Sequence, residues 1–90
     1  VALGWYNLGI AERQRGQIGA AITAYRQALA IDPSYAQAQQ NLAVALLLAG
    51  DIEGARQGFR QAIHLLEGQG AAAAAEALRQ QASTMVKLED

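Results

Sequence analysis

The feature that most constrains this chain is a repeat with a period of 34 residues. When residues 2–35 are compared with residues 36–69, 34 positions further on, ten residue pairs are identical, and conservative pairs such as Tyr25 with Phe59 lie between them. The identical pairs are Ala2 with Ala36, Asn7 with Asn41, Leu8 with Leu42, Ala11 with Ala45, Gly16 with Gly50, Ile18 with Ile52, Ala21 with Ala55, Arg26 with Arg60, Gln27 with Gln61 and Ala28 with Ala62. A period of this size is typical of architectures in which small units stack on one another.

Glycine and capping residues divide each repeat into two segments of helical length. Gly16 and Gly50 stand where a helix needs a left-handed residue to end, and Asp51 is placed to cap the helix that follows. Ser34 and Gln37 predict a capping box before the third segment. The predicted helices cover residues 2–15, 18–31, 36–49 and 52–66.

A fifth helix is predicted over residues 71–88, after a short flexible joint at residues 68–70. Apolar residues recur there every three or four positions, which places them on one face of a helix. Glu89 and Asp90 are expected to fray, because their carboxylates stand at the unfavourable end of the helix dipole.

The charge balance argues against nucleic acid and membranes as partners. Seven Lys and Arg residues against eight Asp and Glu residues give a net charge of -1, so no strong field attracts an anionic polymer or lipid surface. Arg56 and Arg60, four residues apart, are the first candidates if the chain binds nucleic acid. The longest apolar run, residues 42–49, is far shorter than the ~20 residues of a membrane span. The sequence leaves the compartment open, with the cytoplasm favoured.

No combination of residues predicts catalysis or a metal site. The chain has no cysteine and one histidine, so it offers neither a thiolate framework nor a multi-histidine site. Ser34 and Ser83 have only His64 as a candidate base, and no motif links them. We therefore expect a protein that is not an enzyme and that holds no metal or cofactor.

The residues at these repeat positions resemble the tetratricopeptide repeat (TPR) family, whose unit is a 34-residue helix-turn-helix. The first unit agrees with the family pattern at Trp5, Leu8, Gly9, Gly16, Ala21, Tyr25, Ala28 and Pro33, and the second at Leu42, Ala43, Leu46, Gly50, Ala55, Phe59 and Ala62. The resemblance implies an all-α fold, an α-solenoid with five helices in a right-handed superhelical array. Its two units would cover residues 2–35 and 36–69, and a capping helix residues 70–90.

Three residues depart from the family pattern. Glu12 stands where the family usually has an aromatic residue, Gln39 replaces a tryptophan, and Glu67 replaces a proline. The leucine run at residues 46–48 is also unusual, because consecutive helical residues cannot all face one core. Either the last helix covers part of this run, or part of it lines a ligand groove or a protein contact.

The resemblance also implies a binding surface, because in the family the first helix of each unit lines a concave groove for extended peptides or a partner helix. By position, the peptide-binding residues would be Tyr6, Asn7, Ile10, Gln37, Gln40, Asn41, Val44 and Leu47. The fifth helix would add Ala74, Ala75, Leu78 and Gln81. Asn7 and Asn41 occupy equivalent points of the two units, so their amides would hold the backbone of a peptide while apolar neighbours contact its side chains.

Some members of the family bind a terminal carboxylate through a clamp of Lys, Asn, Asn, Lys and Arg. The matching positions here hold Tyr6, Ile10, Asn41, Ala71 and Ala75, so only the second asparagine agrees. The resemblance therefore implies a neutral, partly apolar groove rather than a carboxylate clamp.

Together these observations predict a non-catalytic protein-interaction module, a single domain over residues 1–90 that we expect to be part of a longer chain. Its partner would be a protein or peptide that the sequence does not identify. Two alternatives stay open. One is self-association into a homo-oligomer through an apolar end at Val1, Leu3 and Trp5, since two units are fewer than the about three that usually stand alone. The other is regulation of an enzyme domain elsewhere, or delivery of substrate to it.

Overall fold

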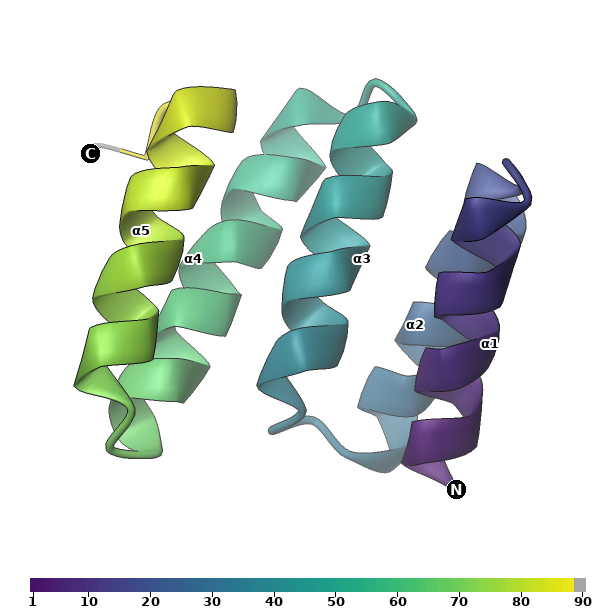
Figure 1. Ribbon diagram of the computed structural model, residues 1–90, viewed down its shortest axis with the longest axis horizontal. Coiled ribbons are helices and arrows are strands. Elements are labelled where there is room, and N and C mark those ends of the chain that lie inside the picture. Colours follow the sequence, from purple (N-terminus) through teal and green to yellow (C-terminus); the bar gives the residue numbers. More distant parts are fainter. Residues whose placement is uncertain (89–90) are drawn as a thin grey trace.

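The computed structural model describes residues 1–88, and that part of the chain consists of five helices joined by short turns (Figure 1). The helices are α1 (Ala2–Gln14), α2 (Ile18–Ile31), α3 (Ala36–Leu48), α4 (Ile52–Gly68) and α5 (Ala72–Met85). The described residues form no strand. The predicted all-α fold is confirmed, and the predicted starts of α1 to α4 agree with the structure to the residue.

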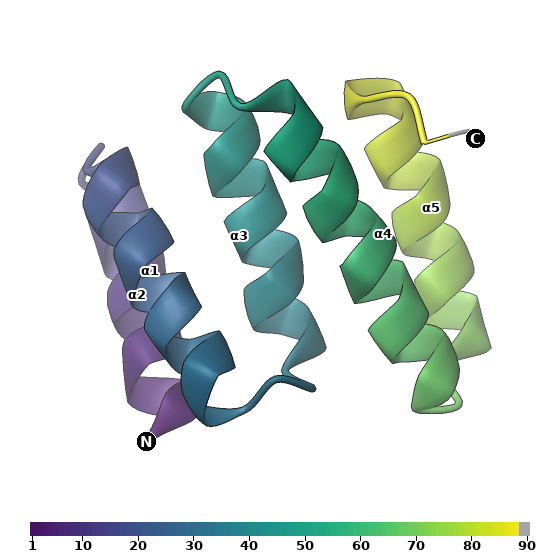
Figure 2. The same cartoon turned by 180° about the vertical axis from the view of Figure 1, so that it is seen from behind.

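The helices form two layers, with each helix packed on the next one along the chain. In Figure 1 α1 lies in front of α2, and in Figure 2, seen from behind, α2 and α4 come forward. The shortest extent of the molecule is 17 Å, which suits two layers whose axes are roughly 8–10 Å apart. This order places α1 and α3 together on one side of the molecule.

Small residues set the close approach of the two helices within each repeat. A Cβ atom added to Gly9 of α1 would lie 2.5 Å from the ring of Tyr25 on α2, and one added to Gly58 of α4 would lie 2.9 Å from the Cβ of Ala43 on α3. Tyr25 and Phe59, at equivalent positions, are the largest fully buried side chains. The aromatic rings therefore fill the space that the small residues leave between the helices.

The turns after α1, α3 and α4 share one geometry. Gly16, Gly50 and Gly70 have φ angles of 81°, 89° and 79°, in the left-handed region that glycine enters without a steric penalty. In each turn the glycine N–H donates to the carbonyl three residues back, and the next N–H donates to the carbonyl five residues back. These bonds define a Schellman motif. The predicted flexible joint at residues 68–70 is thus an ordered turn, which begins only after α4 has continued through Gly68.

The turn before α3 differs from its prediction, while the cap of α4 agrees with it. The Asp32 carboxylate accepts hydrogen bonds from the backbone N–H and the hydroxyl of Ser34, at 3.1 and 2.7 Å. Tyr35 is the N-cap of α3 and no side chain caps it, so the predicted capping box of Ser34 and Gln37 is wrong. Asp51 caps α4 as predicted, accepting from the backbone N–H of Gly54 at 2.9 Å.

Beyond α5 the chain leaves the helical conformation and lies against α4. Val86 is extended, with φ -143° and ψ 156°, and its side chain is buried in the core. Arg56 Nε donates to the carbonyl of Lys87 at 2.5 Å, and an Nη of Arg60 donates to the carbonyl of Leu88 at 3.1 Å. Two arginines that were candidates for nucleic-acid contacts thus bind the chain's own backbone.

The predicted end of the fifth helix at residue 88 is therefore wrong, since α5 ends at Met85. If α5 continued straight to residue 88, the Val86 side chain would lose its burial in the core, and Arg56 and Arg60 would lose their hydrogen bonds to the carbonyls of Lys87 and Leu88. The predicted fraying of Glu89 and Asp90 lies outside the described residues.

Candidate functional site

The eight residues predicted to bind a peptide come from α1 and α3, the two helices that lie together on one side of the array. We call this surface the α1–α3 face, and it consists of Tyr6, Asn7, Ile10, Gln37, Gln40, Asn41, Val44 and Leu47. Asn7 and Gln37 are exposed and the other six are half-buried. Half-buried apolar side chains on this face keep part of their surface available for contact.

Tyr6 is the point at which the two repeats meet on the α1–α3 face. Its ring centroid lies 4.9 Å from that of Tyr35 and 6.1 Å from that of Tyr25, both in tilted arrangements. The Asn41 Nδ2 donates to the Tyr6 hydroxyl at 3.4 Å, a long and therefore weak hydrogen bond. The structure thus brings Tyr6 and Asn41 together, whereas it gives the exposed Asn7 side chain no partner among the described residues.

Tyr25 carries a buried polar group directly beneath this contact. Its side chain is fully buried, and its hydroxyl makes no hydrogen bond of normal geometry with any described residue. Burial raises the pKa of Tyr25, while the neighbouring Asn41 amide and the Arg13 guanidinium each lower it in part. Asn41 therefore lies between two tyrosine hydroxyls, bonded to one and near the other.

The residues predicted on the fifth helix divide between the surface and the core. Ala74 and Gln81 are exposed. Ala75 and Leu78 are only 2% and 4% exposed, and both belong to the core of the molecule. Their predicted place in a groove is wrong, because the face of α5 that carries them is the face that packs against α4. A buried alanine at position 75 also leaves no room for the cation of a carboxylate clamp.

The leucine run that follows Val44 is shared between core and surface. Leu46 is buried, Leu47 is half-buried against the same core, and Leu48 is 57% exposed. The geometry of a helix requires such a division, because successive side chains are about 100° apart. Leu47 therefore keeps its place on the α1–α3 face, whereas Leu48 is an apolar side chain in solvent.

Comparison with known families agrees with this arrangement. Residues 9–50 match the family model described as TPR repeat, a stretch that begins within α1 and ends just after α3. Over these residues the chain is similar to tetratricopeptide repeats, which supports the family resemblance that the sequence indicates. No curated protein matches the sequence. TPR repeats are non-catalytic and generally mediate protein–protein interaction.

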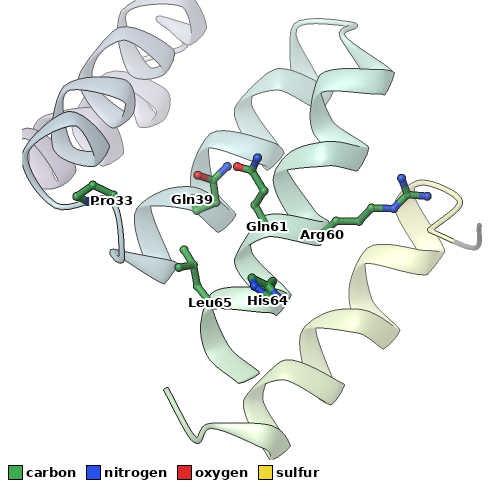
Figure 3. A pocket seen from close by; sticks show the side chains of 6 residues that line it. All are labelled: Pro33, Gln39, Arg60, Gln61, His64 and Leu65. Carbon is green, nitrogen blue, oxygen red and sulfur yellow. The ribbon is translucent and has the colours of Figure 1, made fainter. Parts of the chain in front are cut away.

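One departure from the TPR pattern coincides with a pocket that the sequence analysis did not predict. A pocket of about 350 Å³ opens between the turn that follows α2 and the side of α4, and Gln39, which replaces the family tryptophan, lines it (Figure 3). Its other lining residues are Pro33, Arg60, Gln61, His64 and Leu65. The substitution of a smaller side chain at position 39 was the signal available in the sequence.

The remaining candidates for chemistry are separated from one another. The Ser34 hydroxyl donates to Asp32, and the Ser83 hydroxyl donates to carbonyls of its own helix, at 2.8 Å to Arg79 and 3.1 Å to Gln80. Within residues 1–88 no three acidic, histidine or cysteine side chains lie close enough to hold a metal ion. Every helix in this part of the chain is too short or too polar to cross a membrane.

Proposed function

We propose that the α1–α3 face binds a segment of a partner protein, either an extended peptide or a helix. The observation that carries the proposal is the half-buried cluster of Tyr6, Ile10, Val44 and Leu47 on the same side of the array as Asn41. These four side chains pack against the core from one side, which fixes them in place without burying them. A partner would remove the rest of their apolar surface from water, at a gain of roughly 25 cal/mol for each Å².

Asn41 would give the bound segment its direction. Its Nδ2 donates to Tyr6, whereas its carbonyl oxygen accepts no hydrogen bond from any described residue. A backbone N–H of the partner would donate to this oxygen, and an amide that recognises the backbone does not read side chains. The exposed amide of Asn7 would offer a second contact of the same kind on α1.

The test is to select peptides that bind the 90-residue chain from a display library and to map them by backbone amide chemical shifts. We expect the selected peptides to shift residues of the α1–α3 face. Asn41→Ala should weaken their binding by about 1–3 kcal/mol while the melting temperature changes little.

Tyr6→Phe is the matched control, because it breaks the bond between Tyr6 and Asn41 but keeps the amide. We expect this variant to bind the selected peptides nearly as well as the parent chain. If Asn41→Ala binds normally but unfolds at a lower temperature, the amide is structural and the proposed site loses its most specific residue.

A second candidate function is self-association, and the exposed apolar residues of α1 favour it. Leu3, Trp5 and Leu8 are 55%, 37% and 44% exposed, so one helix presents three large apolar side chains to solvent. The outer side of α5 carries polar residues instead, including Glu76, Gln80 and Ser83. Two copies would therefore meet α1 to α1 about a twofold axis, which closes the assembly at a dimer.

A further inference from the structure

The pocket is lined by Gln39, at a position that holds a tryptophan in the first repeat. The two repeats are related by 34 positions, and Gln39 corresponds to Trp5. The lining residues on α4, which are Arg60, Gln61, His64 and Leu65, correspond to Arg26, Gln27, Ala30 and Ile31 on α2. Two of these four pairs are identical and Leu65 with Ile31 is conservative, so the α4 wall of the pocket resembles the equivalent part of α2, while position 39 lacks the indole of Trp5.

Gln39 is nine-tenths buried without a hydrogen-bonding partner. The residue is 9% exposed, and its amide makes no hydrogen bond with any described residue, although it is not among the fully buried polar groups. Its Nε2 lies near the backbone of Gly58, where a glycine leaves room for it. Because the Gln39 amide makes no hydrogen bond within the described part of the chain, a ligand that offers it a donor or acceptor adds a hydrogen bond to its own burial.

The other walls of the pocket suit a flat apolar group. Pro33 and Leu65 supply apolar surface, and Figure 3 shows Pro33 on the turn after α2 and Leu65, His64 and Gln61 on α4. The Arg60 guanidinium is drawn toward the carbonyl of Leu88, so its aliphatic stem is the part that lines the pocket. A volume of about 350 Å³ lies at the small end of ligand sites, which suits one side chain rather than a cofactor.

We infer that this pocket binds an aromatic side chain with a polar hydrogen, tryptophan or tyrosine, presented by a partner polypeptide. The ring would lie between Pro33 and Leu65, and its N–H or O–H would donate to the Gln39 Oε1. The opening toward solvent lets the partner's main chain remain outside while the ring enters. This site lies apart from the α1–α3 face, and it requires no occupant there.

The first experiment titrates the 90-residue chain with indole and with benzothiophene, which has the same outline but no N–H, and follows backbone and side-chain amide shifts. We expect both probes to shift Gln39, Gln61 and Leu65 and to leave Val44 unshifted. Indole should bind about fivefold more tightly than benzothiophene, as one hydrogen bond predicts. Gln39→Met keeps the length of the side chain but removes the amide, and it should abolish this preference. Equal binding of the two probes to the parent chain would overturn the role of Gln39.

The second experiment decides the source of the ring. N-acetyltryptophanamide should shift the same residues as indole, and N-acetylalaninamide should shift none of them. If indole binds and the capped amino acid does not, the pocket cannot take a ring attached to a main chain, and the inference fails. If neither binds, it fails as well.

The third experiment fills the pocket from within. Gln39→Trp should raise the melting temperature and reduce indole binding at least tenfold, whereas Gln57→Trp, an exposed position on α4, should do neither. A Gln39→Trp variant with a lower melting temperature would show that the pocket does not have the outline of an indole. Peptides selected on the α1–α3 face should bind the Gln39 variants normally, so the outcome here is independent of the proposed function.

Discussion

The two repeats place the same residues in different environments. Leu8 on α1 is 44% exposed, whereas its equivalent on α3, Leu42, is 6% exposed. Ala45 is fully buried on α3, while Ala11, the identical residue on α1, is exposed. The difference arises because α3 packs on α2, the second helix of the preceding repeat, and no described helix covers α1 in that way. In a stacked array, burial is therefore a property of the position in the stack as much as of the residue.

The largest change in the free energy of unfolding is expected at Leu42, which is buried although the equivalent Leu8 is exposed. Leu42→Ala should lower the free energy of unfolding by about 2–4 kcal/mol, because it leaves a cavity between packed helices. Leu8→Ala, the same substitution one repeat earlier, should lower it by less than about 1 kcal/mol. Urea unfolding at low micromolar concentration would measure both values. Equal losses would mean that a second copy or another segment covers α1.

Two glycines of α1 test the packing within one repeat against the exposed outer side. Gly9→Ala should destabilise the chain by about 1–3 kcal/mol, because the new Cβ would overlap the Tyr25 ring. Gly4→Ala has open space around the added atom and should stabilise by about 0.5–1 kcal/mol through helix propensity. Thermal unfolding of the two variants gives the comparison. A stabilising Gly9→Ala would require the Tyr25 ring to move at no cost.

A dimer formed through α1 would bury exposed residues of the first repeat and so reduce the difference in burial between the two repeats. Sedimentation at rising concentration should show a mass approaching two chains, and Leu8→Glu should weaken the dimer at least tenfold, about 1.4 kcal/mol. Thr84→Glu on the outer side of α5 is the control and should leave the mass unchanged. A chain that stays monomeric at millimolar concentration would exclude the twofold contact of α1 with α1.

The smallest effect concerns the one polar atom that distinguishes the two aromatic core residues. Tyr25→Phe makes the first repeat like the second, which has Phe59 at this position, and should stabilise by up to about 1 kcal/mol, because a buried hydroxyl without a partner disappears. A loss of more than 1 kcal/mol would show instead that the hydroxyl is bonded, with the Asn41 amide as its nearest candidate.

The same residue predicts a pH dependence. The folded state raises the pKa of Tyr25 above that of the unfolded chain, so ionisation opposes folding. Its contribution is complete below about pH 10 and is lost as the pH rises toward the folded-state value. Tyr25→Phe should therefore reduce the alkaline loss of stability measured by urea unfolding. Part of the loss should persist, because burial also raises the pKa of Tyr35.

Local signals in the sequence were enough to predict most of the fold. The 34-residue period located the repeats, and Gly16 and Gly50 located the turns within them. A glycine in the left-handed conformation ends a helix because the turn then forms hydrogen bonds to the last carbonyls of that helix. The end of α5 was not predictable in this way, since it depends on guanidinium groups 31 and 28 residues away in the sequence. The same limit applies to Ala75 and Leu78, which were correctly predicted to be helical but whose burial depends on where α4 lies.

The candidate sites likewise combine features that the sequence predicts with features that depend on how the helices pack. The repeat alone shows that Asn7 and Asn41 occupy equivalent positions. The hydrogen bond from Asn41 to Tyr6 joins two helices, so only the packed structure shows it. The replacement of a tryptophan by Gln39 was visible as a departure from the TPR pattern. That the position borders an open pocket follows from the approach of α4 and Pro33, which no short stretch of sequence encodes.

The packing of each helix on the next has a mechanical consequence. Because the interfaces follow one another from α1 to α5, a force applied at the two termini is transmitted through each interface in series. The array then responds as a short spring, and its extension is the sum of the extensions of its interfaces. Gln69, which donates to the carbonyl of Ser34 at 2.7 Å, bridges the turn after α4 to the turn before α3 and stiffens one side of that spring. A load that opens the array on this side would therefore act on that hydrogen bond as well as on the helix interfaces.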